Sequence, residues 1–138
     1  MNNCQLAKTT TDSKILEQLA HDEAPYVRYC VAQNLNTSSE TLNFLSRDKS
    51  LDVRCWVARN PNTSVETLNF LSRDEYYYVR CWVALNYNTL FETLKQMAIH
   101  DEDGWVSEYI LQNPSCNDEL YMYIEGRKLL KTLSEPSS

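Results

Sequence analysis

Residues 53–60 read VRCWVARN, and the chain carries three near-copies of this phrase. The copies lie at residues 27–34 (VRYCVAQN), 79–86 (VRCWVALN) and 106–113 (VSEYILQN), so successive copies begin 26, 26 and 27 residues apart. A fixed period of this length is typical of a solenoid, in which each unit is too small to bury its own apolar face and stacks on its neighbours. The phrase therefore predicts a repeat architecture.

Each repeat reads as two short helices. A Thr-x-x-Glu pattern before the phrase, at residues 37–40, 63–66 and 89–92, is typical of a capping box, in which the Thr and Glu side chains satisfy free amides where a helix begins. The phrase itself predicts the second helix. We expect that helix to stop at residues 60–62 (NPN) and their counterparts, because proline cannot continue a helix and asparagine tolerates a left-handed terminal residue.

The repeats account for nearly the whole chain. We expect one all-α domain over residues 1–138, built as an α-solenoid of about four to five two-helix repeats of 26–27 residues each. The expected repeats are residues 11–36, 37–62, 63–88 and 89–115. A C-terminal capping helix should follow at 116–133, with a disordered tail at 134–138.

An acidic and a basic residue recur six positions apart across the turn between the two helices. The pairs are Asp22 with Arg28, Asp48 with Arg54, and Asp74 with Arg80. We expect a structural ladder in which each guanidinium bridges the carboxylates of its own unit and the adjoining unit with bidentate geometry. The alternative is that these arginines clamp a ligand, but ligand-binding residues rarely recur in every unit.

The net charge and the distribution of apolar residues limit the classes of partner that the protein can have. The net charge is −6, from 13 basic and 19 acidic residues, whereas a nucleic-acid surface normally needs clustered Lys and Arg. No apolar stretch approaches the roughly 20 residues of a membrane span. The N-terminal residues also lack the basic and apolar regions of a secretory signal. The sequence therefore predicts a cytoplasmic protein without membrane contacts, and its charge disfavours nucleic acid as a partner.

Cysteine usage points the same way. The five cysteines are odd in number and form no CxxC pair. Cys55 and Cys81 occupy equivalent positions in neighbouring repeats, about one helix spacing or roughly 10 Å apart, beyond the disulfide limit of about 7 Å between Cα atoms. Thiols arranged along a line also cannot converge on one metal ion. We expect reduced thiols and neither a metal nor a cofactor.

The consensus Val-Arg-x-x-Val-Ala-x-Asn-Pro-x-Thr, followed by a leucine pair and Asp, resembles the leucine-rich repeat variant family. The spacing of Asp48 from Val53 and Arg54 is also similar to HEAT-like repeats. This resemblance covers about residues 11–120 and implies a right-handed α-solenoid of paired short helices. Some family members hold an iron–sulfur centre in an N-terminal cysteine cluster, and some HEAT-like solenoids are DNA glycosylases with a basic groove. Neither property is carried over, because only Cys4 lies near the N-terminus and no basic groove is apparent.

The second helices of a solenoid usually line its concave, ligand-binding face. A helical wheel places two columns of residues on that face: Tyr29, Cys55, Cys81 and Glu108, and beside them Gln33, Arg59, Leu85 and Gln112. It places Trp56 on the core side with Val53 and Val57. With one Arg and one Glu among neutral groups, the expected face suits a protein or peptide segment better than nucleic acid.

The turns between helices offer a second candidate surface. Its aromatic residues are Tyr26, Tyr76, Tyr77, Tyr78 and Trp105. Tyr and Trp are common anchors of protein interfaces, although these side chains could instead close the edge of the core between units.

No enzyme signature is present: the chain has no glycine-rich phosphate loop, no GxSxG elbow and no HExxH motif. We therefore expect a non-catalytic protein–protein interaction module that binds a protein or peptide segment on the concave face or the Tyr-rich edge. The alternatives are a nucleic-acid-associated HEAT-like protein (DNA-processing or a DNA mimic) and a structural spacer. The identity of the partner and the oligomeric state are left open.

Overall fold

The computed structural model describes residues 1–135, and in that part of the chain it contains ten helices and no strand. The helices are α1 (Asn3–Thr9), α2 (Ser13–Leu19), α3 (Pro25–Gln33), α4 (Ser39–Leu45), α5 (Leu51–Arg59), α6 (Val65–Leu71), α7 (Tyr77–Leu85), α8 (Phe91–His100), α9 (Ser107–Ile110) and α10 (Asp118–Ser134). The predicted all-α repeat fold is confirmed.

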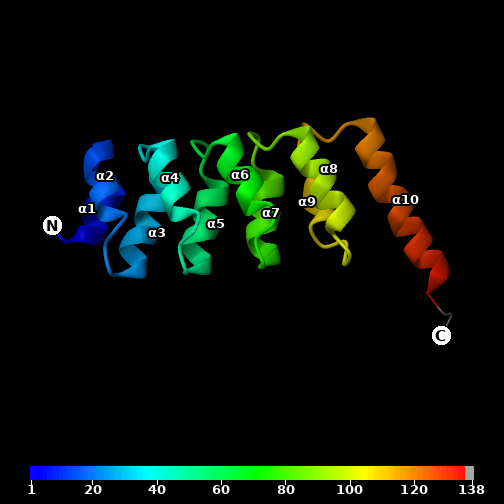
Figure 1. The fold of residues 1–138 in the computed structure, drawn as a ribbon, viewed down its shortest axis with the longest axis horizontal. Helices are drawn as coiled ribbons and strands as arrows, with labels where there is room; N and C mark the ends of the chain where they lie inside the picture. Colours follow the sequence, from blue (N-terminus) through cyan, green and yellow to red (C-terminus); the bar gives the residue numbers. More distant parts are fainter. Residues whose placement is uncertain (136–138) are drawn as a thin grey trace.

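The helices form two rows along one axis, as Figure 1 shows. The second helices α1, α3, α5, α7 and α9 pack on one another in series, whereas α2, α4 and α6 pack mainly on the second helices beside them. Each unit is therefore held to the next through its second helix. The helix α10 leans away from the end of the row.

One helix was not expected from the sequence. We expected the first repeat to begin at residue 11, but α1 precedes it and packs on α3 as α3 packs on α5. The helix is short, and a capping box between Asn2 and Gln5 starts it. Its Ala7 is fully buried. The helix α1 thus acts as the second helix of an incomplete unit at the N-terminal end.

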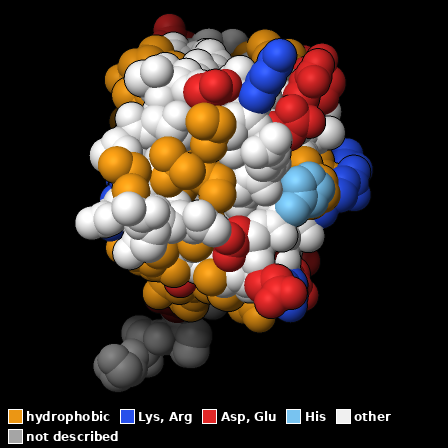
Figure 2. Space-filling model, turned by 90° about the vertical axis from the view of Figure 1, so that its left-hand side faces the viewer, with side chains coloured by type: hydrophobic (Ala, Val, Ile, Leu, Met, Phe, Trp, Pro, Cys, Tyr) orange, Lys and Arg blue, Asp and Glu red, His pale blue; other side chains and the backbone are white. Residues whose placement is uncertain are grey.

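The two ends of the row are formed by different helices. Figure 2 looks at the N-terminal end, where hydrophobic side chains lie among charged and polar ones. At the other end, α10 runs unbroken through Gly126 as far as Ser134, so the expected disorder of Ser134 is wrong. Residues 136–138 of the expected tail lie outside the described residues.

The predicted Thr-x-x-Glu capping boxes are wrong by one residue. Ser38 and Ser64 are the N-caps, and their hydroxyls accept hydrogen bonds from the amides of the residues three positions on. The preceding threonines are buried, and each donates its hydroxyl to a carbonyl at the end of its own second helix: Thr37 to Val31 (2.6 Å), Thr63 to Val57 (2.5 Å) and Thr89 to Val83 (2.6 Å). Threonine thus closes the turn between units. Serine starts the next helix in α4 and α6, whereas the N-cap of α8 is Leu90, which makes no side-chain cap bond.

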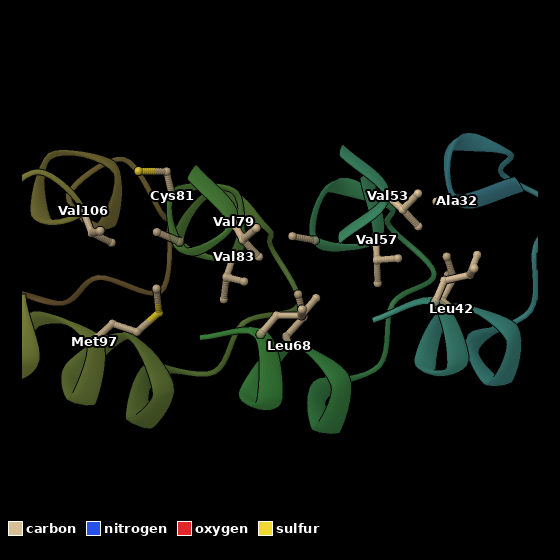
Figure 3. Close-up of a cluster of buried hydrophobic side chains, with 14 of the residues drawn as sticks. Ala32, Leu42, Val53, Val57, Leu68, Val79, Cys81, Val83, Met97 and Val106 are labelled. Carbon is tan, nitrogen blue, oxygen red and sulfur yellow. The ribbon is translucent and has the colours of Figure 1, made fainter. Parts of the chain in front are cut away.

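The core is continuous along the row. Leu42 and Leu68 from the first helices meet Val53, Val57 and Val83 from the second helices, and all five side chains are fully buried (Figure 3). Burying one such side chain contributes about 1.5–3 kcal/mol. Because the same positions recur in each unit, the core of one unit continues into the next.

An asparagine at the end of each second helix joins that unit to the preceding one. The Nδ2 group of Asn60 donates to the backbone carbonyls of Ala32 (2.8 Å) and Asn34 (3.1 Å), and its Oδ1 accepts from the Asn62 amide. The equivalent asparagines, Asn34, Asn86 and Asn113, make the same kind of bond to the preceding unit. We call these contacts the asparagine bridges. The sequence predicted only that the helices stop at these residues.

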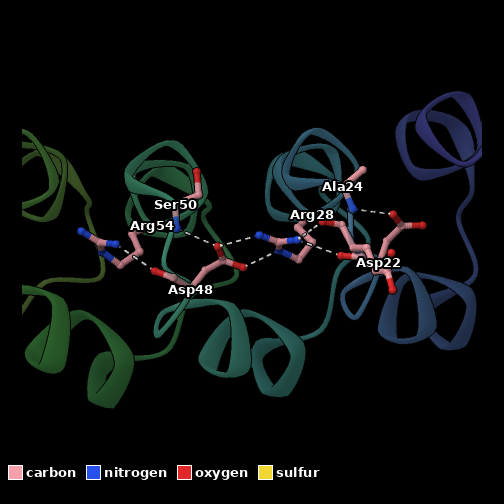
Figure 4. A network of polar contacts seen from close by, with 7 residues as sticks. Asp22, Ala24, Arg28, Asp48, Ser50 and Arg54 are labelled. Atoms are coloured by element: carbon pink, nitrogen blue, oxygen red, sulfur yellow. Dashed lines mark hydrogen bonds and ion pairs between the residues drawn. The ribbon is translucent and has the colours of Figure 1, made fainter.

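The Asp–Arg ladder joins the units at the opposite ends of the second helices. Arg28 Nε and Nη2 donate to the two carboxylate oxygens of Asp48 in the next unit at 2.7 and 3.2 Å (Figure 4). Arg54 pairs with Asp74 in the same way at 2.8 and 3.4 Å. The predicted bidentate pairing between adjoining units is confirmed for these two rungs.

The other half of the ladder prediction is wrong. Within its own unit each arginine donates to the backbone carbonyl of the aspartate, as Arg28 Nη1 does to Asp22 at 2.8 Å, and not to its carboxylate. The Asp22 carboxylate instead accepts from the Ala24 amide and from Asn3, and these bonds lower its pKa. Asp48 likewise accepts from the amide of Ser50 in its own turn, and its arginine partner is Arg28 of the preceding unit.

The third rung of the ladder is absent. Arg80 Nη1 donates to the backbone carbonyl of Asp74 at 2.5 Å. The carboxylate that would continue the ladder, Asp101, accepts from the amide and hydroxyl of Ser107, both at 2.7 Å. The extra residue in the last repeat and the serine in place of arginine explain this change.

Replacement of Asn60 by Ala should lower the free energy of unfolding by about 2–3 kcal/mol, because two buried carbonyls lose their donor. Chemical denaturation monitored by circular dichroism measures this change. Gln33→Ala, an exposed position at the end of α3, is the control and should change stability by less than about 0.5 kcal/mol. Equal effects of the two variants would contradict the role of the asparagine bridges.

Two arginines in equivalent positions allow the ladder to be tested. Arg54→Ala should cost about 3–5 kcal/mol, because it leaves the buried Asp74 carboxylate without its partner. Arg80→Ala should cost about 1 kcal/mol, since it removes only a bond to a backbone carbonyl. Urea denaturation compares the two variants. A loss for Arg80→Ala as large as that for Arg54→Ala would rule out this account of the ladder.

Candidate functional site

A groove of about 760 Å³ is lined by residues of α3, α5 and α7. Its aromatic lining consists of Tyr26, Tyr29, Trp56, Tyr78 and Trp82. Among its other lining residues are Leu51, Cys55, Asp52 and Arg59. We call this surface the aromatic groove. Residues equivalent in successive units line it, because the second helices stack in register.

Arg59 lies between two indole rings in this groove. Its Cζ atom is 3.8 Å from the ring centroid of Trp56, one helical turn earlier on α5, and 4.0 Å from that of Trp82 on α7. A guanidinium over an aromatic face gains cation–π attraction, and here two faces share one cation. Arg59 is also the last residue of α5, where a positive charge complements the helix dipole.

Stacking holds the guanidinium and leaves its donors free. Arg59 makes no ion pair or hydrogen bond with any other residue in the described range. Its exposed N–H groups therefore lie in a plane fixed by the two rings. A planar fork of this kind matches a carboxylate or a phosphate in two-point geometry.

The aromatic wall continues from Trp56 toward α3. The rings of Trp56 and Tyr29 meet edge to face, with centroids 5.8 Å apart and an interplanar angle of 83°. Tyr29 in turn stacks on Tyr26 at 5.6 Å, and the Tyr26 hydroxyl accepts a hydrogen bond from Lys8 at 3.1 Å. The rings therefore support one another along the groove, and each loses less freedom when a ligand binds.

The structure brings together five of the residues predicted for the concave face and the edge. Tyr26, Tyr29, Cys55, Arg59 and Tyr78 all line the aromatic groove. Cys81 does not: it is only 6% exposed and lies between α7 and α9, near Val106 (Figure 3). The prediction that Cys81 faces a partner is therefore wrong, because α9 packs against that side of α7.

The remaining predicted residues of the two columns lie outside the groove. Leu85 is partly buried, and Gln33 is exposed at the end of α3. Gln112 donates to the backbone carbonyl of Glu108, and the Glu108 carboxylate pairs with Lys128 of α10. The short α9 thus contributes to the attachment of α10 and takes no part in the groove.

The Tyr-rich edge divides into three environments. Tyr78 lines the groove, whereas Tyr77 stacks on it at 4.2 Å and meets Trp105 edge to face at 5.1 Å. The Tyr78 hydroxyl raises the pKa of Tyr77 to about 12. Tyr76 lies apart, with its ring 5.6 Å from the Arg54 guanidinium. The four residues therefore do not form one continuous surface.

Sequence reasoning missed the two tryptophans that hold Arg59. The helical wheel placed Trp56 in the core, but Trp56 and its counterpart Trp82 are only partly buried and form walls of the groove. Comparison of Trp56 with the equivalent residue of the first unit could have revealed that its ring is not in the core. The equivalent residue in the first unit is Cys30, which is buried, and an indole is too large for a slot that fits a cysteine.

Cysteine chemistry in the groove is suppressed by burial. Burial raises the pKa of the Cys55 thiol to about 11, and the nearby Asp52 carboxylate adds to the effect. Burial likewise raises the pKa of Cys81 to about 11, with a contribution from Asp101. All five cysteines are free, as the sequence predicted. Neither Cys55 nor Cys81 is therefore set up as a nucleophile at neutral pH.

No family model, curated protein or solved structure matches the chain. Within residues 1–135, no group of three or more His, Cys, Asp or Glu side chains is placed to hold a metal ion. None of the helices that the structure describes is both long and apolar enough to cross a membrane. The function is therefore inferred from the geometry of the groove.

Alkylation of Cys55 by iodoacetamide should be at least about a hundredfold slower in the folded protein than in the unfolded chain. A thiol with a pKa of about 11 carries about a hundredth of the thiolate of one at 9.0, the ordinary value, and burial also limits access. Peptide mass spectrometry after timed labelling at pH 8, with and without denaturant, measures the ratio. Similar rates in both conditions would contradict the placement of Cys55.

Proposed function

We propose that the chain is a non-catalytic protein–protein interaction module that binds a protein segment in the aromatic groove. The observation that carries the proposal is the Arg59 guanidinium, stacked between Trp56 and Trp82 with its hydrogen-bond donors free. Trp, Tyr and Arg are the residues most enriched at the energetic centres of protein interfaces. In this groove all three residue types lie in contact.

The lining of the groove favours one class of partner. Aromatic rings suit aliphatic or proline side chains, and the stacked guanidinium suits a carboxylate. The groove therefore fits an extended segment with an Asp or Glu side chain between apolar residues. A phosphate group is less suited, since Arg59 is the one Lys or Arg among the lining residues and Asp52 lies in the same lining.

The same charges weigh against the nucleic-acid alternative. Non-specific nucleic-acid binding depends on several Lys or Arg contacts to phosphates, and a single arginine supplies one. The spacer alternative does not explain why two tryptophans remain partly exposed around an arginine without a partner. The Asp–Arg ladder, in contrast, is assigned a structural role, because its guanidinium groups are already paired with carboxylates.

The proposal also covers the family of the repeats and the cellular compartment of the protein. We propose that the repeats belong with the leucine-rich repeat variant and HEAT-like solenoids, a relation supported by the recurring phrase and by two-helix units. The free thiols support a reducing, cytoplasmic setting. The contact between Tyr77 and Trp105 is a second, smaller candidate surface for the same partner.

Selection from a random library of short linear peptides tests the proposed function. Peptides that bind the immobilised protein should share an acidic residue flanked by aliphatic residues or proline. Arg59→Ala should weaken their binding by about tenfold to a hundredfold, the value of a hydrogen bond to a charged group. Titration monitored by tryptophan fluorescence measures the affinity, because Trp56 and Trp82 form the walls of the site.

Arg47→Ala is a matched control for this experiment. Arg47 also stacks on an aromatic ring, that of Phe70 at 4.2 Å, but it lies on the first-helix side of the molecule. The control should leave peptide affinity unchanged. Selected peptides that bind the Arg59→Ala variant as tightly as the original protein would contradict the proposal, as would a preference for single-stranded DNA over all peptides.

A further inference from the structure

The aromatic groove carries a second charged side chain, Asp52, at the start of α5. Arg59 lies at the other end of the same helix, and both residues line the groove and are exposed. In the described part of the chain, the Asp52 carboxylate forms no ion pair. The groove therefore presents an unpaired negative group at one end of α5 and an unpaired positive group at the other.

The repeat itself does not need a negative charge at this position. An acidic residue in the first turn of a helix complements the helix dipole, which would be an ordinary structural role for Asp52. The equivalent residues of the neighbouring units are Tyr26 and Tyr78, however, and neither α3 nor α7 has an acidic residue in its first turn. The second helices therefore form without a carboxylate here, and Asp52 is a particular feature of the groove.

The surroundings of Asp52 suit a lysine side chain. Tyr26 and Tyr78, the equivalent residues of the units on either side, line the same groove and are 53% and 55% exposed. Lys8 donates to the Tyr26 hydroxyl at 3.1 Å but is not among the lining residues. The apolar stem of a lysine packs on aromatic rings, whose faces also attract its ammonium group, and that group pairs with a carboxylate. The two ends of α5 therefore favour opposite charges on a ligand.

The spacing of the two charges favours one backbone conformation of the ligand. Asp52 and Arg59 are seven residues apart, so they lie on the same side of α5 and about 10.5 Å apart along its axis. In a polyproline II helix, residues three apart share one side and are separated by about 9.3 Å. In a β-strand, residues three apart point to opposite faces, and residues two apart are separated by only about 6.7 Å. The polyproline II helix is therefore the better match, and aromatic-lined grooves are the surfaces that bind it.

We propose that the aromatic groove binds a proline-rich segment in the polyproline II conformation, with an acidic residue and a lysine three positions apart. This inference rests on the proposed function and names the class of its partner. The acidic side chain pairs with Arg59, and the lysine pairs with Asp52 beside Tyr26 and Tyr78. The segment runs along α5, and either charged residue can come first, because a polyproline II helix can lie along the groove in two directions.

Short synthetic polyproline peptides test the proposal, each with one glutamate and one lysine placed two, three or four positions apart in both orders. Titration of the full chain monitored by tryptophan fluorescence measures their affinities. The better order at the spacing of three should bind about fivefold more tightly than the other two spacings, the upper value for an exposed ion pair. Asp52→Asn should remove this advantage, and it should leave unchanged the affinity of the same peptide with glutamine in place of lysine.

Glu40→Gln is the matched control. Glu40 is also an exposed acidic residue in the first turn of a helix, α4, but it does not line the groove, so this variant should bind every peptide like the original protein. Equal affinities at all three spacings, or equal losses for Asp52→Asn and Glu40→Gln, would overturn the proposal. Peptides with glutamate alone that bind as tightly as the best pair would overturn this inference and leave the proposed function standing. Failure of every peptide to bind, including those selected from the random library, would overturn both.

Discussion

The architecture depends on the asparagine at the end of each second helix. The last carbonyls of a helix have no partner within that helix, and one asparagine amide satisfies two of them in the preceding unit while its own oxygen closes the following turn. The side chain is short and its bonds are directional, so it fixes the distance between units as well as joining them. At the other end of the same helices, the Arg28–Asp48 and Arg54–Asp74 pairs do the same with charged groups. The second helices are thus held at both ends.

This fixed spacing makes the aromatic groove possible. Trp56 and Trp82 are equivalent residues of neighbouring units, and Arg59 fits between them only because α5 and α7 are held one helix spacing apart. The regular arrangement ends where the repeat does. In the last unit Asp101 turns to Ser107, the ladder stops, and the second helix shrinks to the four residues of α9. The groove consequently spans α3 to α7, and the end of the row is formed differently, by the long α10.

Much of the fold could be predicted because repetition amplifies weak signals. Four copies of one phrase identified the units, and the helix stops at Asn34, Asn60 and Asn86 were predicted correctly. The expected left-handed conformation was wrong, because all three asparagines have an extended backbone. The helix α1 could not be found in this way, since it carries no copy of the phrase. The capping assignment failed because Thr37 and Ser38 are both good caps, and only burial of the threonine decides between them. The groove was located on the correct helices, but its central feature was missed. A helical wheel treats one helix at a time, whereas the Arg59 sandwich needs a ring from each of two helices.

Hydrogen exchange of the asparagine side chains tests most directly whether the units are joined as described. Nuclear magnetic resonance resolves the Nδ2 protons of each asparagine. Those of Asn34, Asn60, Asn86 and Asn113 are buried and bonded across units, so they should exchange orders of magnitude more slowly than those of Asn43, which is exposed on α4. Exchange of all five side chains at the rate of Asn43 would show that no such bonds hold the units together.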